Sequence, residues 1–136
     1  MLGDSKQIEE KLIEAARLAK ENSYSPYSNF PVGAAVILED GQIFKGTNIE
    51  NASYGLTCCA ERVALFSART ESSLKITGMA LSLGHKDAKL PKKSLVPCGA
   101  CRQVMSEFLD PATPIYIDGN RSFTMADLLP HPFKLD

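Results

Sequence analysis

Apolar residues recur along this chain with two different spacings, and the spacings divide it into helices and strands. Near the start, apolar residues three and four apart predict a helix over residues 6–22, with Ser5 as its N-cap. Later apolar runs have the length of β-strands, and so predict strands at 32–38, 43–48, 76–83, 115–117 and 121–124. Helical spacing returns over three further segments, at 58 or 59 to 68, 98–109 and 124–129, the last capped by Thr124.

Turn residues connect these segments and suggest the architecture. Asp40-Gly41 predicts a hairpin, Pro111 and Pro114 end a helix, and Asp118-Gly119-Asn120 turns the chain between the last two strands. Helices interspersed among strands in this order favour a sheet with helices on both faces. We therefore expect one α/β domain over residues 1–136, a three-layer α-β-α sandwich. Its five-stranded sheet is mixed, and its last two strands are antiparallel.

Composition narrows the function classes. The chain has 136 residues, 44% of them hydrophobic, and a net charge of −1, which offers little attraction to nucleic acid. No apolar run approaches the roughly 18 residues of a membrane span, and the N-terminus lacks the order of a signal peptide. We therefore expect a cytoplasmic protein that acts on neither membranes nor nucleic acid. In a reducing compartment, its four cysteines are more typical of a metal site or of catalysis than of disulfides.

Two short motifs carry the cysteines. Cys59-Ala60-Glu61 and Pro97-Cys98-Gly99-Ala100-Cys101 both fall where a helix is predicted to begin. The positive end of a helix dipole favours thiolates, and three thiolates can bind zinc while leaving its fourth position open. Cys58 and Cys59 are neighbours that would point about 100° apart on a helix. Spacing alone therefore does not decide which of these two would be the ligand.

Charged residues beside the cysteines suggest supporting roles. Glu61, two residues from a thiol, is placed to move protons, although a glutamate in a first helical turn also simply suits the dipole. Three thiolates give zinc a net negative environment, so a cation should withdraw charge from the sulfurs. Arg62 is the best candidate and Arg102 the second, although either could be a solvated helix residue.

Several motifs together resemble the homotetrameric class of cytidine deaminases. The resemblance runs from about Tyr24 to Phe133 and includes the following segments: Tyr24-Ser25-Pro26-Tyr27-Ser28-Asn29-Phe30, Val32-Gly33-Ala34-Ala35, Asn48-Ile49-Glu50-Asn51-Ala52, Cys59-Ala60-Glu61-Arg62 and Pro97-Cys98-Gly99-Ala100-Cys101-Arg102-Gln103. A cysteine-bound zinc, a glutamate that is not a ligand and a downstream Pro-Cys-x-x-Cys are a described signature of zinc-dependent nucleobase deaminases.

The resemblance implies a role for each site residue. It selects Cys59 over Cys58, so that Cys59, Cys98 and Cys101 would hold zinc, with Glu61 as proton shuttle and Arg62 bonded to the sulfurs. It also implies five substrate contacts: Phe30 beside the base, Asn48 and Glu50 on the ribose, Ala60 in the pocket, and Phe133 from a neighbouring subunit of a homotetramer. Without the family pattern, Phe30 could be plain core and Asn48 a strand-end turn residue.

The implied reaction is zinc-dependent hydrolysis of cytidine and deoxycytidine to uridine and deoxyuridine plus ammonia, a step of pyrimidine salvage. Zinc would acidify a water molecule that attacks C4, while Glu61 would carry protons to N3 and to the leaving amine. The Glu50 carboxylate suits sugar hydroxyls but repels a nearby phosphate, which favours a free nucleoside.

Three alternatives remain at this stage. A sister deaminase of another aminopyrimidine, such as blasticidin S, shares the cysteine motifs but lacks the pattern Asn48-Ile49-Glu50-Asn51. A non-catalytic structural zinc module would use Cys58 as a fourth ligand. A thiol-disulfide oxidoreductase would use Cys98 and Cys101, but it leaves the first motif unexplained.

Overall fold

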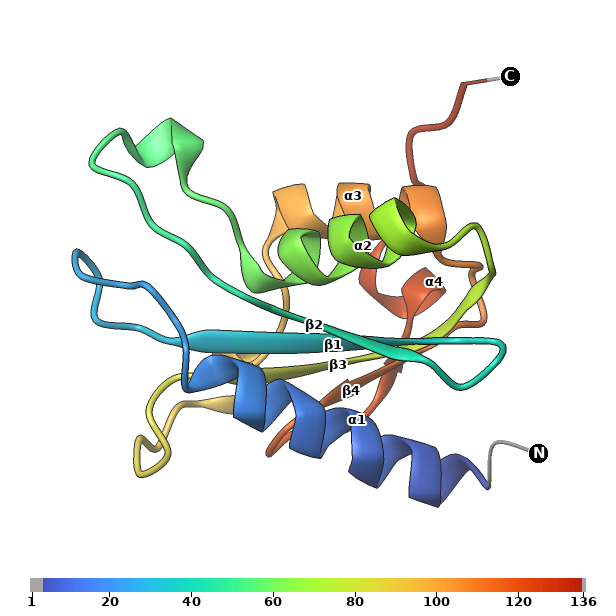
Figure 1. Cartoon of the computed structure of the whole chain (residues 1–136), viewed down its shortest axis with the longest axis horizontal. Helices are drawn as coiled ribbons and strands as arrows, with labels where there is room; N and C mark the ends of the chain where they lie inside the picture. The colour runs from blue at the N-terminus through green and yellow to red at the C-terminus, as the bar shows by residue number, and fades with distance from the viewer. Residues whose placement is uncertain (1–3, 136) are drawn as a thin grey trace.

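A five-stranded sheet in the order β2-β1-β3-β4-β5 forms the centre of the computed structural model, which describes residues 4–135 (Figure 1). Residues 1–3 and 136 of the expected domain lie outside this range. The strands are β1 (Val32–Leu38), β2 (Ile43–Thr47), β3 (Ile76–Leu83), β4 (Pro114–Ile117) and β5 (Phe123–Thr124). β1 is antiparallel to both β2 and β3, β3 and β4 are parallel, and β4 and β5 are antiparallel. The predicted mixed sheet with an antiparallel last pair is confirmed.

Helices cover both faces of this sheet. Helix α1 (Ser5–Lys20) lies on one face, and α2 (Ala60–Glu71), α3 (Gly99–Phe108) and α4 (Met125–Leu128) lie on the other (Figure 1). The predicted three-layer sandwich is therefore confirmed. None of the helices in residues 4–135 is both long and apolar enough to cross a bilayer.

Alternate residues of β1 enter two separate cores. Ala35 and Ile37 pack with α1, whereas Ala34 and Val36 join the larger core beneath α2 and α3. Because both faces of the strand are buried, its sequence is a continuous apolar run rather than an alternation of apolar and polar residues.

Helix ends differ slightly from the prediction. Asp4, not Ser5, is the N-cap of α1, and its carboxylate accepts a hydrogen bond from Gln7 N at 2.8 Å. A carboxylate caps and also complements the positive end of the helix dipole, which favours Asp4 over its neighbour. Thr124 caps α4 as predicted, in a reciprocal pair with Asp127.

Two glycines let helices approach the sheet at backbone distance. A Cβ on Gly33 would lie 1.9 Å from the carbonyl oxygen of Ala16 in α1, and one on Gly46 would lie 2.3 Å from the Ala64 nitrogen in α2. Backbone atoms cannot move aside as a flexible side chain can. The glycine in β2 therefore fixes how closely α2, which begins at the cysteine motif, lies on the sheet.

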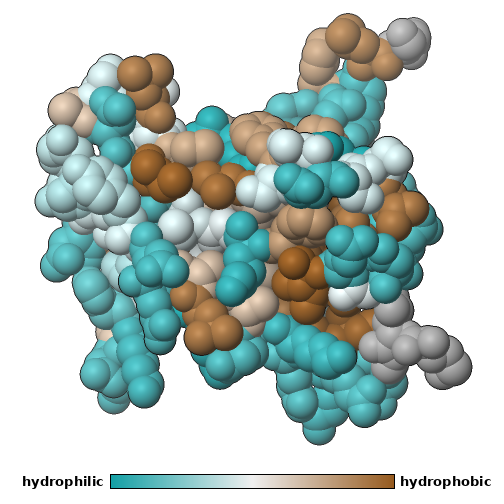
Figure 2. Space-filling view, viewed as in Figure 1, coloured by the Kyte–Doolittle hydropathy of each residue, from teal (hydrophilic) through white to brown (hydrophobic). Residues whose placement is uncertain are grey.

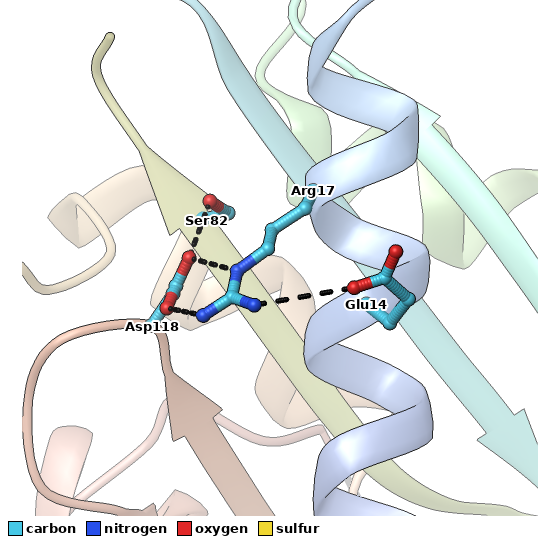
Figure 3. Close-up of polar contacts among 4 residues, drawn as sticks. All are labelled: Glu14, Arg17, Ser82 and Asp118. Atoms are coloured by element: carbon cyan, nitrogen blue, oxygen red, sulfur yellow. Dashed lines mark hydrogen bonds and ion pairs between the residues drawn. The ribbon is translucent and has the colours of Figure 1, made fainter. Parts of the chain in front are cut away.

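An ion pair ties α1 to the ends of two strands (Figure 3). Arg17 donates from Nε and Nη2 to the two carboxylate oxygens of Asp118, at 2.8 and 2.7 Å, and the Ser82 hydroxyl donates to the same carboxylate at 3.0 Å. The hydrogen bond from Arg17 is the main cause that lowers the pKa of Asp118. This two-point contact fixes the turn after β4 relative to α1.

Gly33→Ala should destabilise the fold, because the new methyl group collides with the backbone of α1. We expect a loss of about 1–3 kcal/mol in the free energy of unfolding, measured by urea denaturation. Gly55→Ala is the matched control, because a Cβ at Gly55 has nothing within 4 Å. Equal stability of both variants would contradict the close approach of α1 to β1.

Candidate functional site

Three cysteine sulfurs gather where α2 and α3 begin. The Sγ atoms of Cys59, Cys98 and Cys101 all lie within 4.8 Å of one another, and those of Cys98 and Cys101 are 3.3 Å apart. Cys59 is the N-cap of α2 and Cys98 that of α3, yet neither sulfur makes a capping hydrogen bond. The sulfurs therefore face one another rather than the backbone of their own helices. Cys58 is outside the sulfur cluster found within residues 4–135.

The three cysteines are held in different ways. Cys59 follows a β-bridge in which Ile49 and Cys58 exchange two backbone hydrogen bonds of 2.9 Å. Cys101 is fully buried in the first turn of α3, whereas Cys98 is exposed. The site thus combines two well-anchored sulfurs with one at the end of an irregular segment.

Hydrogen bonds and burial set the protonation of the sulfurs. A hydrogen bond with Cys101, followed by contacts with Arg62, lowers the pKa of Cys59 to about 5. The same bond with Cys59, together with burial, raises the pKa of Cys101. Cys59 is therefore the readier of the two to be a thiolate, and a cation that binds the sulfurs displaces the protons they still carry. Within residues 4–135 the cluster consists of these three sulfurs, and three soft thiolates fit zinc with its fourth position open.

Arg62 lies beside the cluster. Its Nη2 donates to the Thr57 carbonyl at 3.1 Å and lies 3.9 Å from Cys59 Sγ. The contact with Cys59 is also the main cause that raises the pKa of Arg62. Its Nε is buried and has no hydrogen-bond partner among the described residues. The guanidinium is therefore positioned to withdraw charge from a sulfur.

Arg102, the second candidate for that role, has other partners. Its Nε donates to the Pro97 carbonyl and its Nη1 to the Leu128 carbonyl, both at 2.9 Å. Its guanidinium thus joins the segment before Cys98 to the end of α4.

Glu61 is the buried acid of the site. It lies in the first turn of α2 and is only 4% exposed. Burial, and after it the charge of Cys59, raises the pKa of this carboxyl. A carboxyl with a raised pKa can both accept and return a proton nearer to neutral pH than an ordinary glutamate can.

Asn48 organises the loop before β1. Its side-chain oxygen accepts from Val32 N at 2.9 Å and from the Ser23 hydroxyl, and its amide donates to the Phe30 carbonyl at 2.8 Å. The side chain is buried, and one amide hydrogen remains beyond these contacts.

Glu50 faces an open hollow. Its carboxylate accepts from Tyr27 N at 2.9 Å, from Ser28 N at 3.1 Å and from the Ser28 hydroxyl, and the last of these is the main cause that lowers its pKa. The hollow measures about 330 Å³, and its lining consists of Tyr27, Ser28, Glu50, Tyr54 and Thr57. Glu50 is thus a fixed, ionised acceptor beside a space of ligand size. A larger groove of about 850 Å³, between α1 and the segment after β3, contains none of the predicted site residues.

The other predicted substrate contacts, Ala60, Phe30 and Phe133, differ in how far they are buried. Ala60 is fully buried between Cys59 and Glu61, and a Cβ on Gly84 would lie 3.3 Å from the ring of Phe30. Phe133 is 69% exposed on the C-terminal tail, whose hydrophobic surface projects from the molecule in Figure 2. Within one chain, the structure therefore brings together the three clustered cysteines, Ala60, Glu61 and Arg62, but leaves Phe133 on the surface.

Sequence reasoning missed the lining of the hollow. Tyr27 and Ser28 belong to the segment Tyr24–Phe30, but the composition of a loop does not predict where its side chains point. Tyr54 and Thr57 follow the Asn48–Ala52 motif, and no periodicity marks them as facing Glu50. Their proximity to Ser28 results from the path of two loops.

Comparisons with known proteins agree with one another. The family model described as "Cytidine and deoxycytidylate deaminase zinc-binding region" matches residues 6–117. A cytidine deaminase of Halalkalibacterium halodurans is 46% identical over 130 residues, which are 92% of this chain and 93% of that protein. One of Mycobacterium tuberculosis is 38% identical over 122 residues, 89% of this chain and 86% of that protein.

Solved structures show the same likeness. The crystal structure of cytidine deaminase from Burkholderia pseudomallei matches with a TM-score of 0.80 and 45% identity, covering 91% of this chain and 98% of that chain. The crystal structure of cytidine deaminase from Mycobacterium tuberculosis matches with a TM-score of 0.80 and 34% identity, covering 98% of this chain and 100% of that chain.

The sulfur cluster predicts which cysteines bind metal. Wild-type protein should retain about one zinc per chain, and Cys59→Ser, Cys98→Ser or Cys101→Ser should lose most of it because two thiolates hold zinc weakly. Cys58→Ser is the matched control and should keep its zinc. Metal content after gel filtration, measured by mass spectrometry, checks this, and zinc loss in the Cys58 variant alone would contradict it.

Proposed function

The chain belongs to the family of zinc-binding cytidine and deoxycytidylate deaminases, and on that premise we propose how its residues catalyse the hydrolytic deamination of cytidine. The observation that carries the proposal is the group of three sulfurs within 4.8 Å of one another, with a buried glutamate two residues after the first of them. Cytidine and water enter, and uridine and ammonia leave. Deoxycytidine is the second proposed substrate.

Cys59, Cys98 and Cys101 are the proposed zinc ligands. When bound, zinc supplies a Lewis acid that makes a water molecule a stronger nucleophile near neutral pH. Arg62 supports the site by placing its positive charge 3.9 Å from Cys59 Sγ, which offsets part of the negative charge of the thiolates.

Glu61 is the proposed proton carrier. As a bond forms between the water oxygen and C4 of cytosine, this carboxylate takes the proton released by the water and transfers it to N3. It then delivers a second proton from the same oxygen to the amino group, so that the bond from C4 to nitrogen breaks and ammonia leaves. The raised pKa that burial gives Glu61 suits both directions of transfer.

The ribose and the base are assigned to the loops around the hollow. Glu50 accepts hydrogen bonds from ribose hydroxyls, since its carboxylate is already oriented by two backbone N–H groups and Ser28. Asn48 donates its remaining amide hydrogen to the ribose, and its bond to the Phe30 carbonyl holds the Phe30 segment in place. Phe30 and Ala60 contact the base. A phosphate near Glu50 would be repelled, so the substrate is a free nucleoside rather than a nucleotide or nucleic acid.

A homotetramer is the proposed functional assembly. Large apolar side chains are strongly exposed on the tail and on the loop before α2: Phe133, Leu135, Tyr54 and Leu56. Such surface is typical of a face that another subunit covers. In the assembly, Phe133 of one chain reaches the base bound by its neighbour. A cytoplasmic role in pyrimidine salvage fits the free thiols and the nucleoside substrate.

No second function is favoured. The relatives compared above are cytidine deaminases, and the Asn48–Glu50 pattern is present in full. A structural zinc module would need Cys58 as the fourth ligand, and Cys58 lies outside the sulfur cluster of the described residues.

Glu61→Gln tests the proton carrier. We expect a fall in kcat of about 10²–10⁴-fold or more, because the amide cannot accept and return protons, while zinc content stays at the wild-type level. Turnover is followed by the change in ultraviolet absorbance of cytidine. Glu71→Gln, at the exposed end of the same helix, is the matched control. A Glu61→Gln enzyme with wild-type kcat would refute the assignment.

Mixing two impaired variants tests the shared site. Phe133→Ala should raise KM for cytidine roughly tenfold or more, because stacking of a base on an aromatic ring contributes about 1–3 kcal/mol. Co-refolding Phe133→Ala with Glu61→Gln should restore activity, since a hybrid assembly pairs an intact Glu61 with a neighbour's Phe133. Activity no greater than the sum of the separate variants would argue that Phe133 does not cross between subunits.

A further inference from the structure

Cys98 is the sulfur with the least local support. Cys59 follows a β-bridge and Cys101 is fully buried within α3, but Cys98 is exposed and ends a long irregular connection. Between β3 and α3, that connection contains only the short 3-10 turn η2 (Lys92–Ser94). The position of Cys98 therefore depends on what anchors the residues just before it.

Asn120 anchors the middle of that connection. Its side-chain nitrogen donates to the carbonyls of Lys92 and Leu95, at 3.1 and 3.0 Å. Its side-chain oxygen accepts from Arg121 N at 2.8 Å, and its own backbone N–H is bonded to the Ile117 carbonyl at 3.0 Å. The amide is thus fixed in the turn after β4, the turn that Asp118 ties to α1.

Arg102 anchors the residue directly before Cys98. It donates to the carbonyls of Pro97 and Leu128, both at 2.9 Å, so it holds the connection against the end of α4. Pro97 is buried, and Leu95 is only 8% exposed in the larger core. Together with Asn120, this arginine fixes three carbonyls within the six residues before Cys98.

We propose that Asn120 and Arg102 are positioning residues for Cys98, which set its sulfur at the distance from Cys59 and Cys101 that a shared metal requires. The inference rests on the proposed function, in which these three sulfurs bind zinc. A thiolate on a free connection would have to be ordered when the metal binds, whereas one on an anchored connection is already in place. The partners to which these two side chains donate are backbone carbonyls, so both residues act through the backbone.

Zinc affinity of the folded protein is the quantity to measure. Zinc is titrated into metal-free protein in competition with a chromophoric chelator, and Co²⁺ replaces it to give the thiolate-to-cobalt absorption of the site. Asn120→Ala and Arg102→Ala should each weaken zinc binding about 10–100-fold, as the loss of groups supporting a metal site commonly does. Asn120→Asp keeps the shape but not the donor and should be as weak as alanine, whereas Arg102→Lys should recover part of the affinity.

Two controls separate positioning from general stability. Arg69 donates to the Leu74 carbonyl at the far end of α2, over the same five-residue separation as Arg102 and Pro97. Arg121, next to Asn120, bonds to the Ser122 carbonyl and lies over the ring of Phe123. Arg69→Ala and Arg121→Ala should lower the unfolding temperature of the metal-free protein while leaving zinc affinity and the cobalt spectrum unchanged.

The outcomes are distinguishable. If wild-type protein gives no thiolate-to-cobalt band, or keeps it in Cys98→Ser, the zinc assignment itself fails. If wild-type protein gives the band and both alanine variants bind zinc as tightly as it does, the positioning inference is overturned while the zinc site stands. If an alanine variant does not fold, the affinities of Asn120→Asp and Arg102→Lys decide, and wild-type affinity in both would also overturn the inference.

Discussion

The meeting of two helix N-termini at one edge of the sheet is the arrangement on which the rest of this structure depends. Strands β3 and β4 are parallel, so the chain must cross over between them, and α3 lies on that crossover. Helix α3 therefore begins near the end of β3, on the same side as the start of α2. Each helix contributes sulfur at its positive end, where anions are favoured. Sheet topology, more than local sequence, brings the two cysteine motifs together.

The sulfurs and the Glu61 carboxyl can all become negatively charged, and nearby positive charge reduces the repulsion among them. Three sulfurs and the Glu61 carboxyl share a small, partly buried region, where burial and then the charge of Cys59 raise the pKa of Glu61. Two helix dipoles and the guanidinium of Arg62 supply the opposing positive charge. Glu50 is different, because its partners are backbone N–H groups and a hydroxyl, which keep it ionised in the open. The two glutamates thus differ in protonation behaviour, because one is buried and the other accepts hydrogen bonds at the surface.

Local patterns predicted most of the fold and the central residues of the site. Apolar periodicity located the helices and strands to within a few residues, because both faces of the sheet are buried and most of its strands read as apolar runs. Arg62 could be predicted beside Cys59 because residues three apart lie on one helix face. The distant partners of Arg102 and Asn120 could not be predicted, since the carbonyls of Leu128 and Leu95 reach them only through tertiary packing. The roles of Asn48 and Ser28 depend in the same way on the path of the loop before β1.

The contact at Gly46 has a consequence for how substrate gains access. A helix that touches a strand backbone to backbone has no layer of side chains on which to slide, so α2 and β2 form one stiff body. Glu61 lies in the first turn of α2, so its backbone belongs to that body. The two segments that carry Tyr27 and Tyr54 are irregular, and these two rings, whose centroids lie 6.3 Å apart, line the hollow together. On the proposed function, we therefore expect entry and release of the nucleoside to depend on these loops rather than on movement of α2.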